Sequence, residues 1–251
     1  MSFSNDIVLK DEEICYYFRY LDWDSEFFNR PSYFLDIKKS NLLVSNLIKK
    51  EIQERLKGCF VTVKIDTCFN YEIVSFLQEC GCTYIDTEIT LEYISDKNSE
   101  DKDTINQIQA IKENKNEKLP YDELGKSFSL TRFHTDLNIS NSKADILWTN
   151  YLKNYKLSED KHMFSAKISG EFAGIILVNV DKEIATLFFV AVVEQFRGLG
   201  VGRVLINKVL DYFKDYTIQT GTQVKNTNAL NFYISNGLSK IQKTSTILHR
   251  W

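Results

Sequence analysis

The segment that most constrains the fold is a glycine-rich run, Arg197-Gly198-Leu199-Gly200-Val201-Gly202-Arg203. An apolar, strand-like stretch at 184–193 precedes it, and the spacing of apolar residues predicts an amphipathic helix over 201–213. Glycines at alternate positions let backbone N–H groups close around an anion, and the helix N-terminus adds partial positive charge. The order strand, loop, helix therefore predicts an α/β unit that carries a pyrophosphate-binding loop.

Two common phosphate-binding loops do not fit this run. The dinucleotide fingerprint requires a third glycine where Arg203 stands, and an acidic residue about 20 residues further on, where the chain has Thr220-Gly221-Thr222. A P-loop requires Gly-Lys-Ser/Thr, which does not follow. The remaining pattern, R-x-x-G-x-G, resembles motif A of the GNAT acyltransferases (GCN5-related N-acetyltransferases). This resemblance implies that the loop binds the pyrophosphate of coenzyme A, and a plain strand-to-helix turn is the alternative.

A second motif follows the loop and resembles the other GNAT signature: Asn226-x-x-Ala229-x-x-Phe232-Tyr233-x-x-x-Gly237. The spacing places Ala229, Phe232 and Tyr233 on one helix face, and Gly237 suits a left-handed C-cap. The resemblance implies that Asn226 contacts the cofactor and that Tyr233 protonates the leaving thiolate. A phenol with a pKa near 10 stays protonated at neutral pH and suits that role. An ordinary core tyrosine is the alternative.

The strand before the loop carries Phe189-Val190-Ala191-Val192. In the GNAT family, the corresponding strand splays from its neighbour and pairs with pantetheine. The resemblance therefore implies cofactor contacts at Val190 and Val192, and a backbone amide at Val190 that polarises the thioester carbonyl as an oxyanion-hole donor. The position requires only apolar side chains, so the sequence is compatible with this role without being diagnostic of it.

Length and composition limit the other possibilities. The 251 residues are 43% hydrophobic and 26% charged, as in an ordinary globular enzyme of one or two domains. A net charge of −3 gives no reason to expect a nucleic-acid or membrane partner. No signal peptide or membrane-spanning run is visible, so we expect a cytoplasmic protein. Five cysteines without a C-x-x-C pair and three scattered histidines predict neither a disulfide framework nor a metal site.

A polar stretch at 95–103 divides the chain, and we predict a smaller N-terminal α/β domain at 1–98 and a GNAT domain at 99–251. The fold class expected is α/β with a mixed sheet. The expected helices cover 41–56, 71–80, 122–128, 143–157, 201–213 and a segment after Asn226; the expected strands cover 60–65, 83–93, 104–111, 163–168, 173–180, 184–193, 216–221 and 238–248.

The two halves share a spacing. Asn70-x₅-Phe76-x₄-Gly81-x₃-Ile85 matches Asn226-x₅-Phe232-x₄-Gly237-x₃-Ile241. Joints of helix, glycine and strand often look alike, and that is one explanation. The other is that the first half is a degenerate GNAT copy, with Leu77 at the position of Tyr233 and no glycine loop. In both cases we expect the first half to shape the substrate site without running the chemistry.

A further resemblance concerns the acceptor. The runs Trp23-Asp24-Ser25-Glu26-Phe27-Phe28 and Arg132-Phe133-His134-Thr135-Asp136 are similar to stretches of the bacterial TDP-fucosamine N-acetyltransferases. This implies a homodimer and a dTDP-linked amino-dideoxy sugar as substrate, for surface polysaccharide (O-antigen) synthesis. The chemistry of the side chains agrees: Arg132 suits a phosphate, Trp23, Phe27 and Phe28 suit stacking, and Asp24, His134 and Asp136 suit an amine. Core packing of the aromatic residues and a local Arg132–Asp136 pair are the alternatives.

The expected mechanism is direct transfer from acetyl-CoA or a longer acyl-CoA. A neutral amine attacks the thioester, the oxyanion meets the strand amide, and Tyr233 protonates the thiolate. The general base is left open, with a water chain to Asp136 or His134 as one possibility. Two rival functions remain: an N-acetyltransferase for another small amine or a peptide, and a non-catalytic acyl-CoA-binding regulator.

Overall fold

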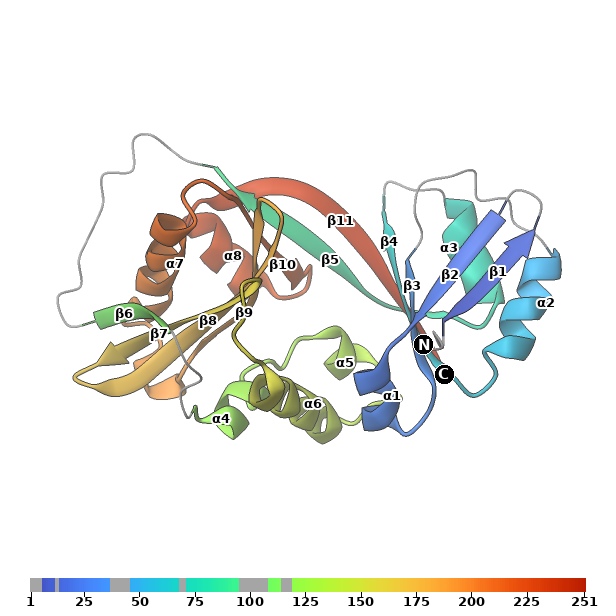
Figure 1. Ribbon diagram of the computed structural model, residues 1–251, viewed down its shortest axis with the longest axis horizontal. Helices are drawn as coiled ribbons and strands as arrows, with labels where there is room; N and C mark the ends of the chain where they lie inside the picture. The colour runs from blue at the N-terminus through green and yellow to red at the C-terminus, as the bar shows by residue number, and fades with distance from the viewer. Residues whose placement is uncertain (1–5, 12–13, 37–45, 68–70, 95–107, 114–118) are drawn as a thin grey trace. The chain divides into compact units, whose positions relative to one another are not determined.

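A computed structural model of the chain describes residues 6–11, 14–36, 46–67, 71–94, 108–113 and 119–251. These residues form two compact units (Figure 1). Unit 1 comprises residues 1–88 together with Lys243–Trp251, and unit 2 comprises Ile89–Gln242. The division thus falls ten residues before the expected end of the first domain at 98. It lies inside a strand, and the last strand of the chain also contributes residues to both units.

Unit 1 begins with elements that the sequence did not predict. These are β1 (Ile7–Asp11), β2 (Ile14–Tyr20), α1 (Asp22–Phe28) and β3 (Ser32–Asp36). The expected elements follow: α2 (Asn46–Arg55), β4 (Phe60–Asp66), α3 (Tyr71–Glu79) and the first part of β5 (Thr83–Tyr93). The strands run in the order β1-β2-β3-β4-β11, where β11 is Leu238–Arg250. The pair β3/β4 is parallel, and β4/β11 is antiparallel. Apolar side chains of α2 and α3 pack with those of β3, β4 and β11 in one core.

Unit 2 contains β6 (Ile108–Glu113), α4 (Tyr121–Lys126), α5 (Arg132–Thr135), α6 (Asn141–Asn154), β7 (Lys161–Ile168), β8 (Glu171–Asp181), β9 (Ile184–Val192), a 3₁₀ turn (Glu194–Phe196), α7 (Val201–Tyr212), β10 (Thr217–Gln223) and α8 (Thr227–Ser235). The strand order is β5-β10-β9-β8-β7-β6. The fold is the expected mixed α/β class, and the elements expected in the described residues agree within a few positions. Residues 104–107 of the strand expected at 104–111 lie outside the described residues, and so does Asn70.

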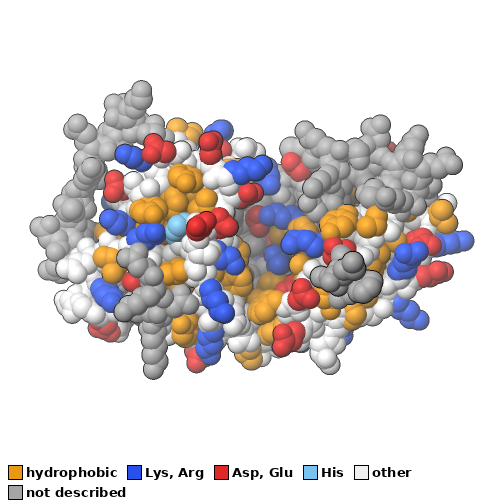
Figure 2. Space-filling view, viewed as in Figure 1, with side chains coloured by type: hydrophobic (Ala, Val, Ile, Leu, Met, Phe, Trp, Pro, Cys, Tyr) orange, Lys and Arg blue, Asp and Glu red, His pale blue; other side chains and the backbone are white. Residues whose placement is uncertain are grey.

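The sheet of unit 2 is covered on both faces, which explains the apolar run in β8. Ile176 and Val178 pack in the cluster that holds α7, and the alternating residues Ile175 and Leu177 pack with α4 and α6. Successive residues of a strand point to opposite faces, so a strand buried on both sides is apolar throughout. On the visible face, acidic and basic side chains are interspersed (Figure 2).

The pairing between β9 and β10 ends before either strand does. These parallel strands are in register from Thr217↔Ile184 to Thr220↔Leu187. Beyond that pair, β9 continues to Val192 and β10 to Gln223. The far part of β9 stays paired on its other side, where β8 follows it as far as Gly174↔Val192. The strands therefore part after Leu187, as the resemblance implies.

Each unit contains a helix that ends at a left-handed glycine before a long strand. Gly81 (φ +92°) follows α3 and precedes β5, and Gly237 (φ +85°) follows α8 and precedes β11. Both units also place a parallel strand pair before that helix, β3/β4 and β9/β10. The shared order β-α-β-α-β favours the interpretation of the first half as a degenerate copy of the second.

The two reasons for glycine at position 237 can be separated by mutation. A Cβ there would lie 2.6 Å from the Tyr93 ring, whereas Gly170, also at φ +85°, has no atom within 4 Å of its would-be Cβ. We expect Gly170→Ala to cost about 1–2 kcal/mol for the left-handed backbone alone. Gly237→Ala should lose about 1–3 kcal/mol more through overpacking. Denaturant unfolding of both variants measures the difference, and equal losses would contradict the contact with Tyr93.

Candidate active site

One cavity of about 620 Å³ lies in unit 2 at the point where β9 and β10 part. Its wall combines the segment after α4, the far part of β9, the glycine loop, the start of α7, the end of β10 and one face of α8. The predicted cofactor-binding residues that line it are Val190, Val192, Arg197, Gly198, Gly200, Val201, Gly202, Arg203, Asn226 and Tyr233. Leu199 is not on the wall, and its side chain is 52% exposed.

The glycine loop has the backbone of a tight anion-binding turn. Gly198 (φ +78°) and Gly200 (φ +84°) are both left-handed, and Gly200 is the N-cap of α7. Gly202 is glycine for a different reason, because a Cβ there would lie 2.8 Å from the Phe232 ring. The exposed side chains of Arg197 and Arg203 add positive charge. The donor set therefore fits a pyrophosphate at the helix N-terminus.

Tyr233 projects from α8 into this cavity and is 7% exposed. Burial raises the pKa of Tyr233 above 10, while a hydrogen bond with Thr220 acts in the opposite direction. Thr220 is the last β10 residue paired with β9, and its hydroxyl donates to the Leu187 carbonyl at 3.1 Å. The phenol is therefore protonated at neutral pH and held at the point where the strands part. Asn226, also on the wall, caps α8 by accepting a hydrogen bond from the Ala229 amide at 3.2 Å.

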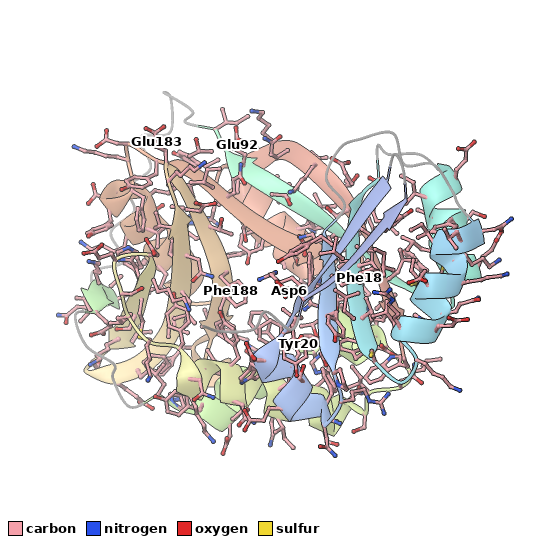
Figure 3. All side chains as sticks on the ribbon, turned by 45° about the vertical axis from the view of Figure 1, so that its right-hand side comes forward. Asp6, Phe18, Tyr20, Glu92, Glu183 and Phe188 are labelled. Carbon is pink, nitrogen blue, oxygen red and sulfur yellow. The ribbon has the colours of Figure 1, made fainter. Side chains whose placement is uncertain are left out.

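Residues outside the predicted cofactor-binding set form the rest of the wall, although Ala229 and Phe232 belong to the second motif and Ala191 to the strand before the loop. They are Ser127, Phe128, Ser129, Leu130, Thr131, Phe188, Ala191, Phe196, Gly221, Thr222, Gln223, Asn228, Ala229, Phe232, Ser235 and Asn236. Two aromatic residues stand out among them. Phe128 stacks on Phe189 at 4.0 Å between ring centroids. Phe188 of β9, which is labelled in Figure 3, packs against Tyr151 at 4.9 Å between ring centroids. Phe128 belongs to no motif, and Phe188 has only the apolar character that a buried strand requires, so neither was predicted individually.

The three acceptor residues predicted in unit 2 do not themselves line the cavity. Asp136 is 1% exposed, and its carboxylate accepts hydrogen bonds from the backbone and side-chain nitrogens of Asn138 at 2.9 and 3.0 Å. The Arg132 guanidinium lies over the Phe133 ring at 4.4 Å. His134 contacts Thr131, which does line the cavity.

The four acceptor residues predicted in unit 1 all lie on α1. The rings of Trp23 and Phe27 are stacked at 5.6 Å with an interplanar angle of 15°. Phe28 is a core residue, packed against Phe60 at 4.8 Å and Trp251 at 5.5 Å. Asp24 lies in the first turn of the helix. For Phe28, therefore, the geometry favours the core-packing alternative.

Residues 128–237 match the model of the Acetyltransferase (GNAT) family. This part of the chain is thus similar to a GNAT acetyltransferase domain, and it holds nearly the whole cavity wall. The family uses acyl-CoA as co-substrate, in agreement with the glycine loop and Tyr233. None of the curated proteins matches the chain in sequence.

Solved structures share the fold over nearly the whole chain. A functionally unknown conserved protein from Staphylococcus epidermidis has a TM-score of 0.62 at 13% identity, covering 99% of this chain and 95% of its own. A GCN5-related N-acetyltransferase from Sphaerobacter thermophilus has 0.60 at 12%, covering 94% and 76%. A tandem GNAT protein from the clavulanic acid biosynthesis pathway has 0.57 at 12%, covering 97% and 81%. At such identities the likeness concerns the fold alone.

Two other features bear on the site. Among the described residues, no group of three or more His, Cys, Asp or Glu side chains is placed to hold a metal ion. No helix in the described ranges is long and apolar enough to cross a membrane.

The contact between Gly202 and Phe232 predicts a defect in cofactor binding. In Gly202→Ala the new methyl displaces the Phe232 ring from its place on the cavity wall. We expect the Kd for coenzyme A to rise by about tenfold, which corresponds to about 1.4 kcal/mol. Isothermal titration calorimetry measures it. The control is the same change in a Phe232→Ala background: with no ring to displace, the added methyl should leave the Kd of Phe232→Ala nearly unchanged. A Kd unchanged in Gly202→Ala alone would contradict the predicted crowding.

Proposed function

We propose that unit 2 transfers an acyl group from acyl-CoA to an amine. The observation that carries this proposal is the cavity, which brings the glycine loop and the buried Tyr233 together where β9 and β10 part. The match of residues 128–237 to the GNAT family supports it. The parted strands leave the inner edge of β9 facing the cavity, where backbone groups can pair with the amides of pantetheine.

The mechanism follows from the placement of these groups. The loop at Arg197–Arg203 holds the pyrophosphate and so fixes the thioester along β9. A backbone amide at Val190 is the proposed donor to the oxyanion that forms when a neutral amine attacks. As the tetrahedral intermediate collapses, the C–S bond breaks and Tyr233 gives its proton to the thiolate sulfur. Transfer is direct, so no cysteine nucleophile takes part.

For the acceptor we propose a dTDP-linked amino-dideoxy sugar with a 3-amino or 4-amino group, used in surface polysaccharide synthesis. The resemblance of Trp23–Phe28 and Arg132–Asp136 to TDP-fucosamine N-acetyltransferases supports it, and so does the Trp23/Phe27 aromatic pair, which suits stacking on a base. We further propose a cytoplasmic homodimer.

Thiol release tests the reaction and the acceptor together. Purified protein is mixed with acetyl-CoA or a longer acyl-CoA and with a panel of dTDP-3-amino and dTDP-4-amino sugars, small amines and a peptide amine. We expect release above background with at least one dTDP-amino sugar, with the acylated sugar confirmed by mass spectrometry. Turnover of a small amine or the peptide amine, without turnover of any dTDP-amino sugar, would contradict the proposed acceptor and identify that other amine class as the acceptor. Tight coenzyme A binding without any turnover would favour the regulator.

Tyr233→Phe removes the proposed acid and leaves the aromatic ring in place. We expect kcat to fall by about 10²- to 10⁴-fold, the usual contribution of a positioned proton donor. The Kd for coenzyme A should stay near the wild-type value. Because burial raises the pKa of Tyr233 above 10, the acid form persists, and kcat should not decline between about pH 7 and 9 through loss of this proton. Wild-type turnover of the variant would remove the assigned acid.

A further inference from the structure

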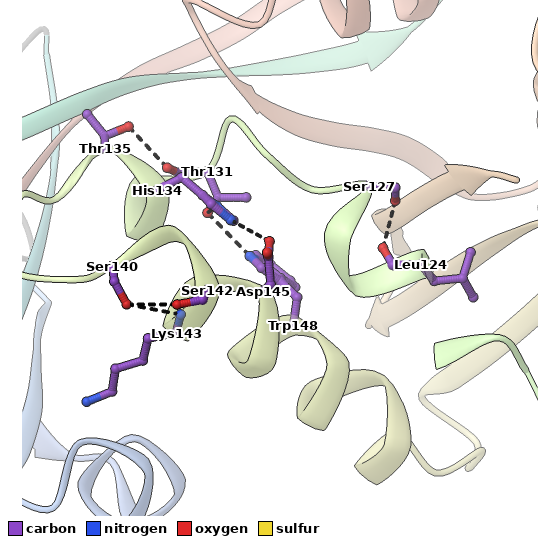
Figure 4. Close-up of polar contacts among 10 residues, drawn as sticks. All are labelled: Leu124, Ser127, Thr131, His134, Thr135, Ser140, Ser142, Lys143, Asp145 and Trp148. Atoms are coloured by element: carbon purple, nitrogen blue, oxygen red, sulfur yellow. Dashed lines mark hydrogen bonds and ion pairs between the residues drawn. The ribbon is translucent and has the colours of Figure 1, made fainter. Parts of the chain in front are cut away.

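A chain of hydrogen bonds leads from the cavity wall into the adjoining helix α6 (Figure 4). Thr131 is a residue of the wall, and its Oγ1 lies 2.8 Å from His134 Nδ1. The other ring nitrogen of His134, Nε2, lies 3.1 Å from Asp145 Oδ1. The Trp148 indole N–H donates to the same Thr131 oxygen at 3.3 Å. None of these contacts involves Tyr233 or the glycine loop, so the function described so far does not use them.

The chemistry of the partners fixes the direction of each hydrogen bond. An ionised carboxylate only accepts, so Asp145 requires the proton of neutral His134 to be on Nε2. Nδ1 is then an acceptor, and the Thr131 hydroxyl must donate to it. The indole N–H of Trp148 is a donor only and takes one of the two acceptor positions on Thr131 Oγ1. The second acceptor position suits a substrate N–H.

The side chains become more exposed from His134 to Asp145. The His134 side chain is 4% exposed, whereas that of Asp145 is 28% exposed and reaches solvent. Thr131 is also the N-cap of α5, yet its side chain makes no capping hydrogen bond. A threonine at this position ordinarily accepts a backbone N–H of the first turn. Here the hydroxyl is instead held between His134 and Trp148.

Resting on the acyltransferase function proposed above, we propose that Thr131, His134 and Asp145 form a proton relay that serves as the general base. As the amine nitrogen bonds to the thioester carbon, its N–H passes a proton to Thr131 Oγ1. The Thr131 proton moves to His134 Nδ1 in the same step, and Asp145 stabilises the resulting imidazolium.

The proton count closes over one turnover. The C–S bond breaks, the thiolate takes the proton of Tyr233, and the amide and the free thiol are the products. The imidazolium then releases one proton to solvent, and the Tyr233 phenolate regains one. This assignment answers the question of the base that the sequence left open. His134 acts through Thr131, whereas Asp136 is 1% exposed, lies off the cavity wall and accepts two hydrogen bonds from Asn138 on Oδ1.

Three variants test the relay, measured with the panel amine that wild type turns over fastest. Thr131→Val keeps the shape and loses the hydroxyl, and kcat should fall by about 10²- to 10⁴-fold. Thr131→Ser keeps the hydroxyl and should restore most of the activity. Asp145→Asn can donate to Nε2 and so favours the Nδ1–H tautomer, which cannot take the Thr131 proton; its loss should resemble that of Thr131→Val. Thr149→Val, a buried threonine of α6 away from the wall, is the control.

Two further measurements separate the relay from a structural role and from the function itself. All variants should bind coenzyme A with the wild-type Kd. ¹⁵N-histidine NMR of the protein without substrate should show His134 as the Nε2–H tautomer, assigned with His134→Gln. Acetyl-CoA hydrolysis, with water as the acceptor, provides the same comparison of variants if no amine is turned over. The relay is overturned by wild-type kcat in Thr131→Val, by the Nδ1–H tautomer, or by an acetyl group found on Thr131, which would make it a nucleophile.

Discussion

The site depends on one interruption in the sheet of unit 2, the end of pairing between β9 and β10 at Thr220↔Leu187. A parallel pair that continued would satisfy the inner edge of β9 and close the space between the strands. Because buried backbone groups are almost always paired, an edge left open in this way is a place for a ligand that carries amides of its own. At the point where the strands part, the Thr220 hydroxyl donates a hydrogen bond to the Leu187 carbonyl and also contacts Tyr233.

The parting of the strands also explains why the glycine loop and the tyrosine meet. The glycine loop follows β9, and α8, which carries Tyr233, follows β10. Both segments therefore begin where the strands part, and both line the same cavity. Gly202 lets α7 approach the Phe232 ring closely, which joins the two helices on the wall. The separation of two neighbouring strands thus positions an anion-binding turn and a proton donor in one space.

The sequence predicted those parts of the structure in which a local pattern of residues requires a particular backbone conformation or a buried face. Gly200 and Gly237 were expected at turns and both have left-handed backbones. The spacing of apolar residues in α7 predicted its buried face. Tyr233 was selected because it lies in the motif that follows the glycine loop. The first four elements were missed, because β1, β2, α1 and β3 have only five to seven residues each, too few for a period of apolar residues to be recognised. Phe188 and Thr131 were not assigned individual roles, because they reach the wall through strand pairing and loop placement, which spacing does not encode.

The comparison of the two halves shows why only one of them is proposed to be catalytic. Both place a helix, a left-handed glycine and a long strand after a parallel strand pair. At the position of Tyr233 the first half has Leu77, which is buried in the unit 1 core with Phe76 and Leu248. A leucine has no proton to give, and Leu77 is buried in a core, whereas Tyr233 lines a cavity. A tyrosine at position 77 would therefore crowd the core without placing an acid at a binding site.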